Sequence, residues 1–405
     1  MENKRSSEYY VTLLTELCIV MNALDGLKVL ELGQLIAGPF AAKTLGDFGA
    51  DVIKVESAGG DPLRKWRLLR DGTSVWWQVQ SRNKRSVTLD LRSEEGQETV
   101  RRLAKEADVV IENFKPGKLE DWKIGWEQLH SINPGLIMLR ISGYGQTGPY
   151  SQKPGFGVLG EAMGGLRYLT GEPGRVPVRV GVSIGDTLAA LHGVLGVLMA
   201  LRHKEVNGGE GQYIDVALYE SVFNVMESLL PEYDVFGTTR EQAGSALPGI
   251  APSNAYQCRD QHYVLIGGNG DSIYQRLMKK IGRIDLADAS DLAHNDGRVK
   301  RVEEIDQAIQ NWTQQRSRDE VIDALDSVGV PVGKIYSIQD ITEDPQYQAR
   351  DMLVTTRDNA GNILKVPGIV PKLSLTPGKI SYPAPDLGEH TKDVLGSPHW
   401  PKRGD

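Results

Sequence analysis

The residue best suited to covalent chemistry is Asp186, which follows Val182-Ser183-Ile184-Gly185 and opens an apolar stretch that ends at Leu201. Aspartate is among the commonest helix N-caps, a role worth about 1 kcal/mol of stability. The same position favours an ionised carboxylate, because the amide dipoles at a helix start stabilise negative charge. An ionised aspartate beside a flexible glycine loop can attack a thioester carbonyl as a nucleophile. The residue types alone favour a capping role for Asp186 and leave open whether it is a nucleophile.

A second candidate is the glycine-containing turn from Gly33 to Pro39, with Glu56 roughly 20 residues further on, where a ribose-binding acid is expected. The turn lacks the three-glycine fingerprint that brings a backbone close to a pyrophosphate. A second glycine run, Gly268-Asn269-Gly270, has Ile273 where a third glycine would stand. The pattern favours a Rossmann-like sheet and disfavours a nicotinamide cofactor.

Six basic residues gather early in the chain and allow two interpretations: Arg64, Lys65, Arg67, Arg82, Lys84 and Arg85. They are either solvated surface side chains, which is the commoner case, or contacts for the phosphate oxygens of an anionic cofactor. The seven histidines show no metal-ligand spacing, so no metal site is predicted. His192, on the apolar stretch after Asp186, is expected to be a satisfied core histidine.

Alternating strands and helices must position these residues. Apolar runs predict strands at 27–32, 51–56, 108–112 and 136–141, with helices at 40–48 and 94–106. This alternation predicts an α/β fold with a parallel sheet covered on both faces, whose ligands lie at the carboxyl ends of the strands. The stretch 186–201 is apolar on nearly every side, which predicts a core helix.

Composition narrows the classes of protein. A chain of 405 residues suggests about two or three domains. A net charge of −7 without a basic tract disfavours nucleic-acid binding, and the absence of an apolar run of about 18 residues predicts no membrane span. The two cysteines, Cys18 and Cys258, exclude a disulfide framework and indicate a reducing, cytoplasmic location. The 45 glycines indicate many turns or close backbone approaches.

We divide the chain into five parts. Residues 1–23 are expected to form an N-terminal extension, and our hypothesis is that residues 1–20 precede an alternative start at Met21. Residues 24–225 form the N-terminal part of a large Rossmann-like domain, 226–250 a linker, 251–345 a smaller middle α/β or α+β domain, and 346–405 a C-terminal segment that returns to the large domain.

Seven short motifs follow one another in a fixed order: Leu24-Asp25-Gly26-Leu27, Ala37-Gly38-Pro39, the run 45–56, Arg82-Asn83-Lys84-Arg85-Ser86, the run 110–117, the run 142–149, and the run 211–217. Any one of them is weak, but the ordered series resembles the class III CoA-transferases over about residues 24–395. That family contains formyl-CoA transferase, the carnitine CoA-transferase and α-methylacyl-CoA racemase. The resemblance implies an interlocked homodimer and a CoA thioester that is a substrate rather than a tightly bound cofactor.

The resemblance also implies roles for individual residues. The family's catalytic aspartate falls on Asp186. The CoA contacts fall on Leu35, Ile36, Ala37, Lys84, Asn113, Phe114 and Tyr144, and the loop that covers the active site falls on Gly267, Gly268, Asn269 and Gly270. Amides of this loop are expected to stabilise developing oxyanions. Ile36 replaces a glutamine of formyl-CoA transferase. Two phosphate-contacting arginines are replaced by Ser57 and Asp121, which leaves Arg64 or Arg67, and Lys115 or Lys123, as candidate substitutes.

The racemase branch of the family uses a His-Asp pair, but Gly155-Phe156-Gly157-Val158 contains neither residue, so the chain resembles a transferase. The whole pattern is most like members that move CoA from succinyl-CoA to small dicarboxylic acids. Arg167, Arg175 or Arg179 is either a contact for a distal carboxylate or a solvated surface residue. Formyl or oxalyl transfer, racemisation and a non-enzymatic CoA-binding scaffold remain the alternatives.

Overall fold

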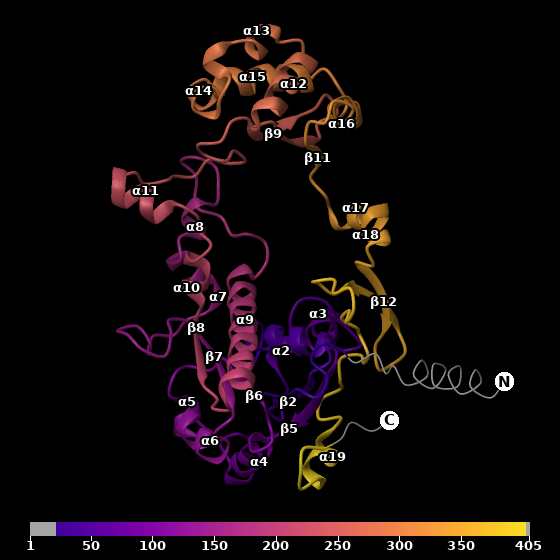
Figure 1. Ribbon diagram of the computed structural model, residues 1–405. Coiled ribbons are helices and arrows are strands. Elements are labelled where there is room, and N and C mark those ends of the chain that lie inside the picture. The colour runs from indigo at the N-terminus through magenta and orange to yellow at the C-terminus, as the bar shows by residue number, and fades with distance from the viewer. Residues whose placement is uncertain (1–21, 402–405) are drawn as a thin grey trace, which may run out of the picture. The chain divides into compact units, whose positions relative to one another are not determined.

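The computed structural model describes residues 22–401, which divide into two compact units (Figure 1). The first unit holds residues 22–165, 181–226 and 349–401, and the second holds Leu166–Val180 and Glu227–Gln348. The sequence-based division differs, since it placed 166–180 in the large domain and 226–250 in a linker. The two segments instead bond to each other within the second unit: the Tyr168 hydroxyl donates to Glu241 at 2.7 Å. The expected extension lies outside the described residues except for its last two positions.

A six-stranded parallel sheet forms the centre of the first unit, which confirms the predicted α/β fold. Its order is β5-β2-β1-β6-β7-β8. The strands are β1 (Lys28–Glu31), β2 (Asp51–Glu56), β5 (Lys84–Thr88), β6 (Val109–Glu112), β7 (Ile137–Ser142) and β8 (Tyr213–Ala217). The four predicted strands agree with β1, β2, β6 and β7 to within one residue at each end, whereas the two edge strands were not predicted.

Helices and short hairpins complete the first unit. The helices are α2 (Ala37–Asp47), α3 (Val75–Gln80), α4 (Glu94–Ala104), α5 (Lys118–Asp121), α6 (Trp126–Ile132), α7 (Gly157–Met163), α9 (Ile184–Asn207), α10 (Leu218–Phe223) and α19 (Thr391–Gly396), with a 3₁₀ turn η1 (Pro62–Lys65). The hairpins join β3 (Leu69–Arg70) to β4 (Thr73–Ser74) and β12 (Leu353–Arg357) to β13 (Ile363–Pro367).

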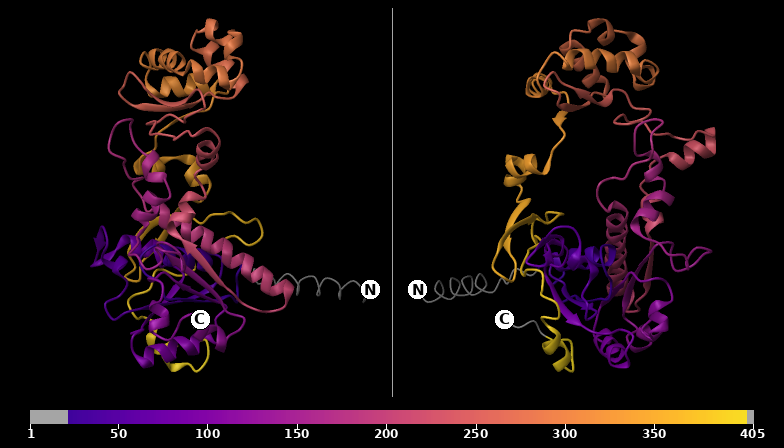
Figure 2. Two further views of the ribbon diagram at one scale, coloured as in Figure 1. Left: turned by 90° about the vertical axis from the view of Figure 1, so that its left-hand side faces the viewer. Right: turned by 180° about the vertical axis from the view of Figure 1, so that it is seen from behind.

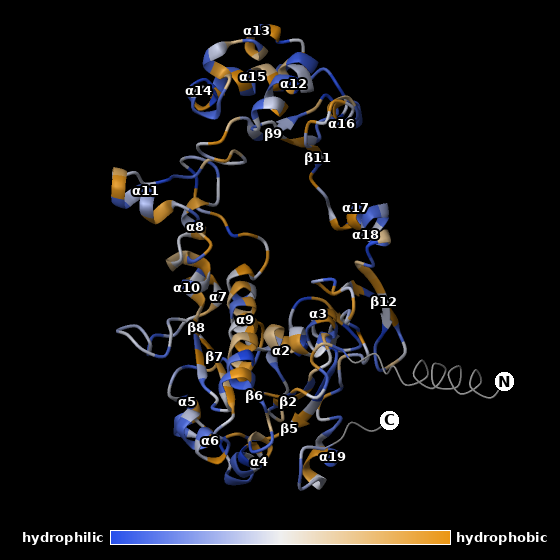
Figure 3. Ribbon diagram, in the orientation of Figure 1, coloured by the Kyte–Doolittle hydropathy of each residue, from blue (hydrophilic) through white to orange (hydrophobic). Residues whose placement is uncertain are grey.

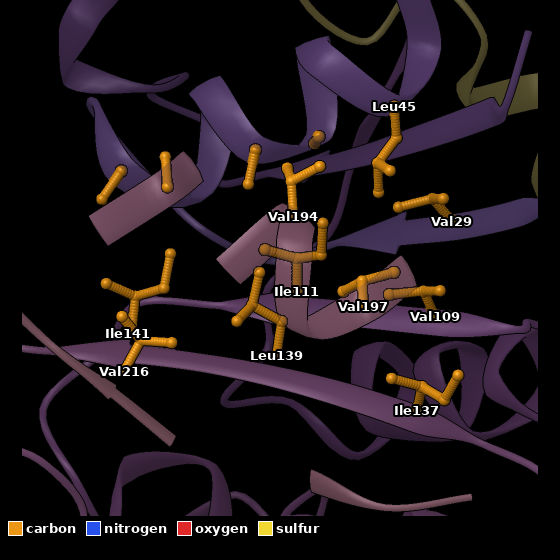
Figure 4. Close-up of a cluster of buried hydrophobic side chains, with 14 of the residues drawn as sticks. Val29, Leu45, Val109, Ile111, Ile137, Leu139, Ile141, Val194, Val197 and Val216 are labelled. Carbon is orange, nitrogen blue, oxygen red and sulfur yellow. The ribbon is translucent and has the colours of Figure 1, made fainter. Parts of the chain in front are cut away.

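Side chains that alternate along each strand form a hydrophobic core on each face of the sheet. Val29, Val109 and Ile111 pack with α2 and α9 on one face, as Figure 4 shows. Leu30 and Val110 point to the opposite face, where α4 and α6 cover them. A parallel sheet needs cover on both faces, so its strands are apolar without interruption.

Helix α9 runs along the sheet and approaches it closely (Figure 2). A Cβ placed on Gly193 would lie 2.7 Å from Leu139 Cδ2, so only glycine permits this spacing. The prediction of a core helix holds for one face alone, because Leu191, Leu195 and Met199 are exposed, the last at 68 %. In residues 22–401, α9 is the one helix long and apolar enough to cross a membrane by length and composition (Figure 3), but it packs as part of the unit's core.

The C-terminal segment packs along the β5 edge of the first unit. The backbone amide of His390 donates to Ser86 O at 2.9 Å, and Asn83 Nδ2 donates to Lys379 O at 2.9 Å. Trp400 joins the core under α4. Residues far apart in the sequence therefore close this side of the sheet.

The second unit is built on a three-stranded antiparallel sheet in the order β11-β10-β9. The strands are β9 (Ser253–Gln257), β10 (Tyr263–Gly267) and β11 (Val332–Lys334). The helices are α8 (Leu166–Leu169), α11 (Leu229–Phe236), α12 (Asp271–Lys280), α13 (Ile284–Ala287), α14 (Asn295–Lys300), α15 (Val302–Thr313), α16 (Arg318–Asp326), α17 (Ile338–Glu343) and all but the last residue of α18 (Pro345–Ala349), with a 3₁₀ turn η2 (Ser290–Leu292). Antiparallel strands with segregated helices are typical of an α+β unit.

Candidate active site

Asp186 lies in the first turn of α9 and is not its N-cap. The helix begins at Ile184 with Ser183 as N-cap, so Asp186 is the third helical residue. The prediction of capping is wrong because the helix starts two residues earlier than the apolar pattern indicates. The position still favours an ionised carboxylate, since the amides of the first turn carry the positive end of the helix dipole.

Two glycines let the starts of α7 and α9 meet at Asp186. A Cβ placed on Gly157 would lie 2.8 Å from Asp186 Cγ and closer still to its Oδ2. A Cβ on Gly185 would lie 3.2 Å from Glu161 Cγ and 3.3 Å from Gly157 O. The Asp186 carboxyl group therefore rests directly against the Gly157 backbone, and the buried Glu161 lies one turn further along α7.

Tyr144 belongs to the same region, in the loop that follows β7. A Cβ placed on Gly155 would lie 3.1 Å from the Tyr144 ring, so the ring stacks against the segment that leads into Gly157. Asp215 holds this loop by accepting the Gln146 amide at 2.9 Å, and burial raises the pKa of the Asp215 carboxyl group. The structure thus brings Tyr144 and the segment carrying Gly157 together at the carboxyl end of the sheet.

Five side chains, from β2, α3, β5 and two loops, hold the backbone of the turn that carries Leu35, Ile36 and Ala37. Asn113 accepts the Gln34 amide at 2.8 Å and donates to the Gln34 carbonyl at 2.9 Å. Four further side chains hold the rest of the turn: Lys54 donates to Gly33 O, Gln80 to Ile36 O and Lys84 to Pro39 O, each at 2.8 Å, and Asp61 accepts the Leu35 amide at 3.1 Å. The turn is thus fixed by the protein itself.

This arrangement changes what several predicted CoA contacts can do. Lys84 is 1 % exposed, and its ammonium group pairs with Glu31 Oε2 at 2.7 Å. Ile36 and Ala37 are also buried, so these side chains face the interior of the unit. The Asn113 side chain is held by its hydrogen bonds to the turn backbone. The half-buried Phe114 ring packs edge-on against the Trp122 ring, with 5.2 Å between the ring centroids.

A buried charge network underlies the turn. Lys54 is fully buried and contacts Glu31 Oε1 at 2.8 Å and Asp61 Oδ2 at 2.9 Å. Burial opposes the charge on Lys54, but the attraction of these carboxylates outweighs it and raises the lysine's pKa. Burial lowers the pKa of Lys84 to about 8, partly offset by Glu31. Glu56 is not available to bind a ribose, because it is buried and pairs with Arg64 at 2.8 Å.

Most of the early basic cluster is neither a solvated face nor an open anion site. Four of its members are buried in ion pairs: Arg64 with Glu56, Arg82 with Asp47, Lys84 with Glu31, and Arg85 with Asp51. Arg67 is exposed, and its guanidinium lies 4.6 Å from the centre of the Trp76 ring, beside the cluster that packs on Leu35. Of the two candidate replacements near Ser57, Arg67 is therefore the one turned to solvent.

The predicted covering loop lies in the second unit, between β10 and α12. The Gly267 amide donates to Pro331 O at 3.0 Å and the Gly268 amide donates to Pro252 O at 2.9 Å. These two amides are thus already paired, which corrects the expectation that they stabilise oxyanions. Gly270 is the N-cap of α12, and Asn269 O accepts from the fully buried Arg298 at 2.7 Å.

The remaining predicted residues fall at separate places. Arg167, Arg175 and Arg179 all belong to the 166–180 segment of the second unit, the last two exposed. Lys115 and Lys123 are exposed in the first unit. His192 Nδ1 lies 3.0 Å from Leu188 O, as expected for a hydrogen-bonded histidine, but the side chain is half-buried and does not belong to the core. No group of three or more potential metal ligands occurs between residues 22 and 401.

Five residues of this region were not identified from the sequence: Lys54, Asp61, Gln80, Gly157 and Glu161. One signal was available, because a lysine in the middle of the apolar strand 51–56 must find a buried partner. In the sequence, Gly157 was noted only as part of the segment 155–158, which lacks the His-Asp pair of the racemase branch. Nothing in the sequence indicates that Asp186 packs on it, since the two residues belong to different helices.

Comparisons with known proteins agree with this architecture. The family model of CoA-transferase family III matches residues 24–391. The chain is 47 % identical over 374 residues to the succinyl-CoA–D-citramalate CoA-transferase of Chloroflexus aurantiacus, covering 92 % of this chain and 93 % of the relative. It is 42 % identical over 377 residues, with the same coverage, to the beta subunit of succinyl-CoA–L-malate CoA-transferase from the same organism.

A solved structure shares the fold over nearly the full length. The crystal structure of a CaiB/BaiF family protein from Brucella suis superposes with a TM-score of 0.81 at 37 % identity, covering 93 % of this chain and 99 % of that protein. The family model spans most of the chain and the relatives exceed 30 % identity over nine-tenths of it. The chain therefore belongs to CoA-transferase family III.

Proposed function

We propose that this enzyme transfers CoA from succinyl-CoA to a small dicarboxylic acid, with Asp186 as the nucleophile. The observation that carries the proposal is the match, over 92 % of the chain, to relatives named as succinyl-CoA transferases for citramalate and malate. The packing of the Asp186 carboxyl group on Gly157 supports it, because it holds a carboxylate at a helix start where ionisation is favoured.

Transfer follows from acyl exchange on this carboxylate. An Asp186 oxygen attacks the thioester carbonyl of succinyl-CoA, the C–S bond breaks, and a mixed anhydride and CoA thiolate form. The thiolate attacks the Asp186 acyl carbon, and succinate leaves as the carboxylate. The acceptor carboxylate then attacks the aspartyl thioester and releases the thiolate. Attack of the thiolate on the acceptor's acyl carbon yields the new thioester and restores Asp186.

The geometry around Gly157 favours transfer over racemisation. A racemase of this family needs a His-Asp pair in the 155–158 segment to move the α-proton. Here the Gly157 position faces the Asp186 carboxyl group so closely that a side chain would collide with it. The segment thus supports the nucleophile instead of supplying a base.

For CoA itself, we propose that the Leu35–Ala37 turn contributes its backbone, while Phe114 and Tyr144 offer aromatic surface. Arg67 supplies the cation that Ser57 lacks, because it is exposed and lies on Trp76 beside the turn. Lys115 or Lys123 supplies the second cation. Asn113 and Lys84 contribute to CoA binding indirectly, because their side chains hydrogen-bond to the backbone of this turn and hold it in place. We retain the loop 267–270 as the covering segment.

We further propose a cytoplasmic homodimer without a tightly bound cofactor. The homodimer is supported by the apolar face that α9 exposes, which a second copy of the chain would cover. This face consists of Leu191, Leu195, Leu198 and Met199. A large apolar face exposed on a single chain is typical of a protein–protein contact.

A panel assay tests the proposed reaction. The enzyme is incubated with succinyl-CoA and with malate, citramalate, glutarate or oxalate in turn, and new CoA thioesters are identified by mass spectrometry. We expect thioesters of the four- or five-carbon dicarboxylates and release of succinate. Exchange of α-deuterium in a branched acyl-CoA without any transfer would instead indicate a racemase.

A further inference from the structure

We infer that Asp61 is a positioning residue for CoA binding, because it holds Leu35 in a left-handed backbone conformation. The inference rests on the proposed function, in which the Leu35–Ala37 turn receives CoA. Asp61 lies beneath this turn and reaches its backbone only. It is therefore assigned an effect on binding of the CoA moiety, not on the chemical steps at Asp186.

The first observation is the backbone of Leu35, whose φ angle is +63°. Side chains with a Cβ rarely adopt this region, because the Cβ approaches the following carbonyl oxygen. A glycine would adopt it freely. Such strained residues persist where their surroundings over-determine them, and they gather at functional sites.

The second observation is what determines this conformation. The Leu35 amide donates to both carboxylate oxygens of Asp61, at 3.1 and 3.2 Å. The same carboxylate accepts the Leu63 amide at 2.9 Å, and the Asp61 amide donates to Glu56 at 2.9 Å. Asp61 is thus fixed at its side chain and its backbone, with 2 % of its surface exposed.

Lys54 extends this support to the opposite side of the turn. Its ammonium group contacts Asp61 at 2.9 Å and also donates to Gly33 O at 2.8 Å. One buried cation therefore ties the residue before Gln34 to the carboxylate that holds Leu35. A turn held in this way is already in its binding conformation when the ligand arrives, so little ordering accompanies binding.

The strain has a specific place, because it falls on Leu35, which belongs to the turn proposed to receive CoA. Leu35 is partly buried against the cluster of Leu63, Trp77 and Ala384. A glycine would relieve the strain but would lose this contact. The chain keeps the side chain and supplies Asp61 to hold the backbone. Asp61 and Leu35 should consequently be coupled in CoA binding.

A double-mutant cycle tests this coupling. The Kd of CoA is measured by titration calorimetry for the full-length enzyme, with Asp61→Asn introduced into wild-type, Leu35→Gly and Leu35→Ala backgrounds. We expect Asp61→Asn to raise Kd about 10-fold in the wild-type and Leu35→Ala backgrounds, where the residue remains strained, and less than about 3-fold in the Leu35→Gly background. In steady-state assays of Asp61→Asn, KM for succinyl-CoA should rise while kcat changes less than about twofold.

Equal effects of Asp61→Asn in the glycine and alanine backgrounds would overturn the inference, since a merely structural role would not depend on the backbone freedom of residue 35. Failure of the wild-type enzyme to bind CoA would refute the proposed function along with it. Normal CoA binding without coupling would refute only the role of Asp61.

A second measurement needs no variant and so does not depend on a substituted protein folding. Amide hydrogen exchange of the peptide containing residues 33–38 is followed in the wild-type enzyme with and without saturating CoA. A turn that is already ordered should exchange slowly in both states. Fast exchange that slows only when CoA is added would contradict the inference.

Discussion

Replacing Gly157 with alanine should displace the Asp186 carboxyl group and leave the fold in place. The new Cβ would lie 2.8 Å from Asp186 Cγ, whereas ordinary contacts begin near 3.4 Å. The carboxyl group must therefore move by roughly 1 Å once its nearer oxygen is included, and a displacement of this size can reduce a rate about 10²-fold. Overpacking of this kind typically costs about 1–3 kcal/mol of stability.

The assay is the steady-state rate of CoA transfer, with thermal unfolding measured in parallel. We expect Gly157→Ala to lower kcat about 10²-fold at a nearly unchanged KM for succinyl-CoA, because the CoA turn is elsewhere in the unit. Gly396→Ala in α19 is the matched control, since a Cβ there meets nothing within 4 Å. A folded Gly157→Ala enzyme with kcat within twofold of wild type would refute the importance of this contact.

Three further predictions concern other residues. Lys54→Met should lower the free energy of unfolding in urea by about 3–5 kcal/mol, because it leaves the buried Asp61 carboxylate without its cation and removes one of the two lysines that pair with the buried Glu31. A loss below about 1 kcal/mol would contradict the network. Arg67→Ala should raise KM for succinyl-CoA several-fold while Lys65→Ala, at a neighbouring exposed cation, should not, and equal effects would remove Arg67 as the specific contact. Burial raises the pKa of the Cys258 thiol to about 11, so the native protein holds its proton more tightly than the unfolded chain. Stability should then fall as pH rises from about 9 to 11, less so in Cys258→Ala, and alkylation of Cys258 at pH 8 should be slow until the protein unfolds.

The strands that could be predicted from the sequence are those whose apolar runs are continuous. Strands β1, β2, β6 and β7 lie inside the sheet, and burial on both faces makes their sequences easy to recognise. Strand β5 was not predicted, because its first residues, Lys84-Arg85-Ser86, are typical of a polar surface segment. Its partners, Glu31, Asp51 and Glu56, come from strands more than 25 residues away, so its burial follows only from the assembled sheet.

The candidate site likewise has features that are local in the sequence and features that depend on the assembled fold. Asp186 could be identified as a candidate carboxylate because it stands in a helix start, which is a local feature. Its contact with Gly157 depends on how α7 and α9 pack, and helix packing is not encoded in either segment alone. Asn113 and Lys84 were found by family resemblance, but their hydrogen bonds to the turn became visible only in three dimensions.

The most direct test of the central claim is to trap the covalent intermediate on Asp186. The enzyme is mixed with succinyl-CoA, quenched within the first turnover with hydroxylamine, digested and mapped by mass spectrometry. Reaction through an aspartyl anhydride or thioester should leave a hydroxamate on the peptide containing Asp186. Folded Asp186→Asn protein should show neither the adduct nor transfer. A modified residue elsewhere, or transfer by Asp186→Asn at the wild-type rate, would contradict the account.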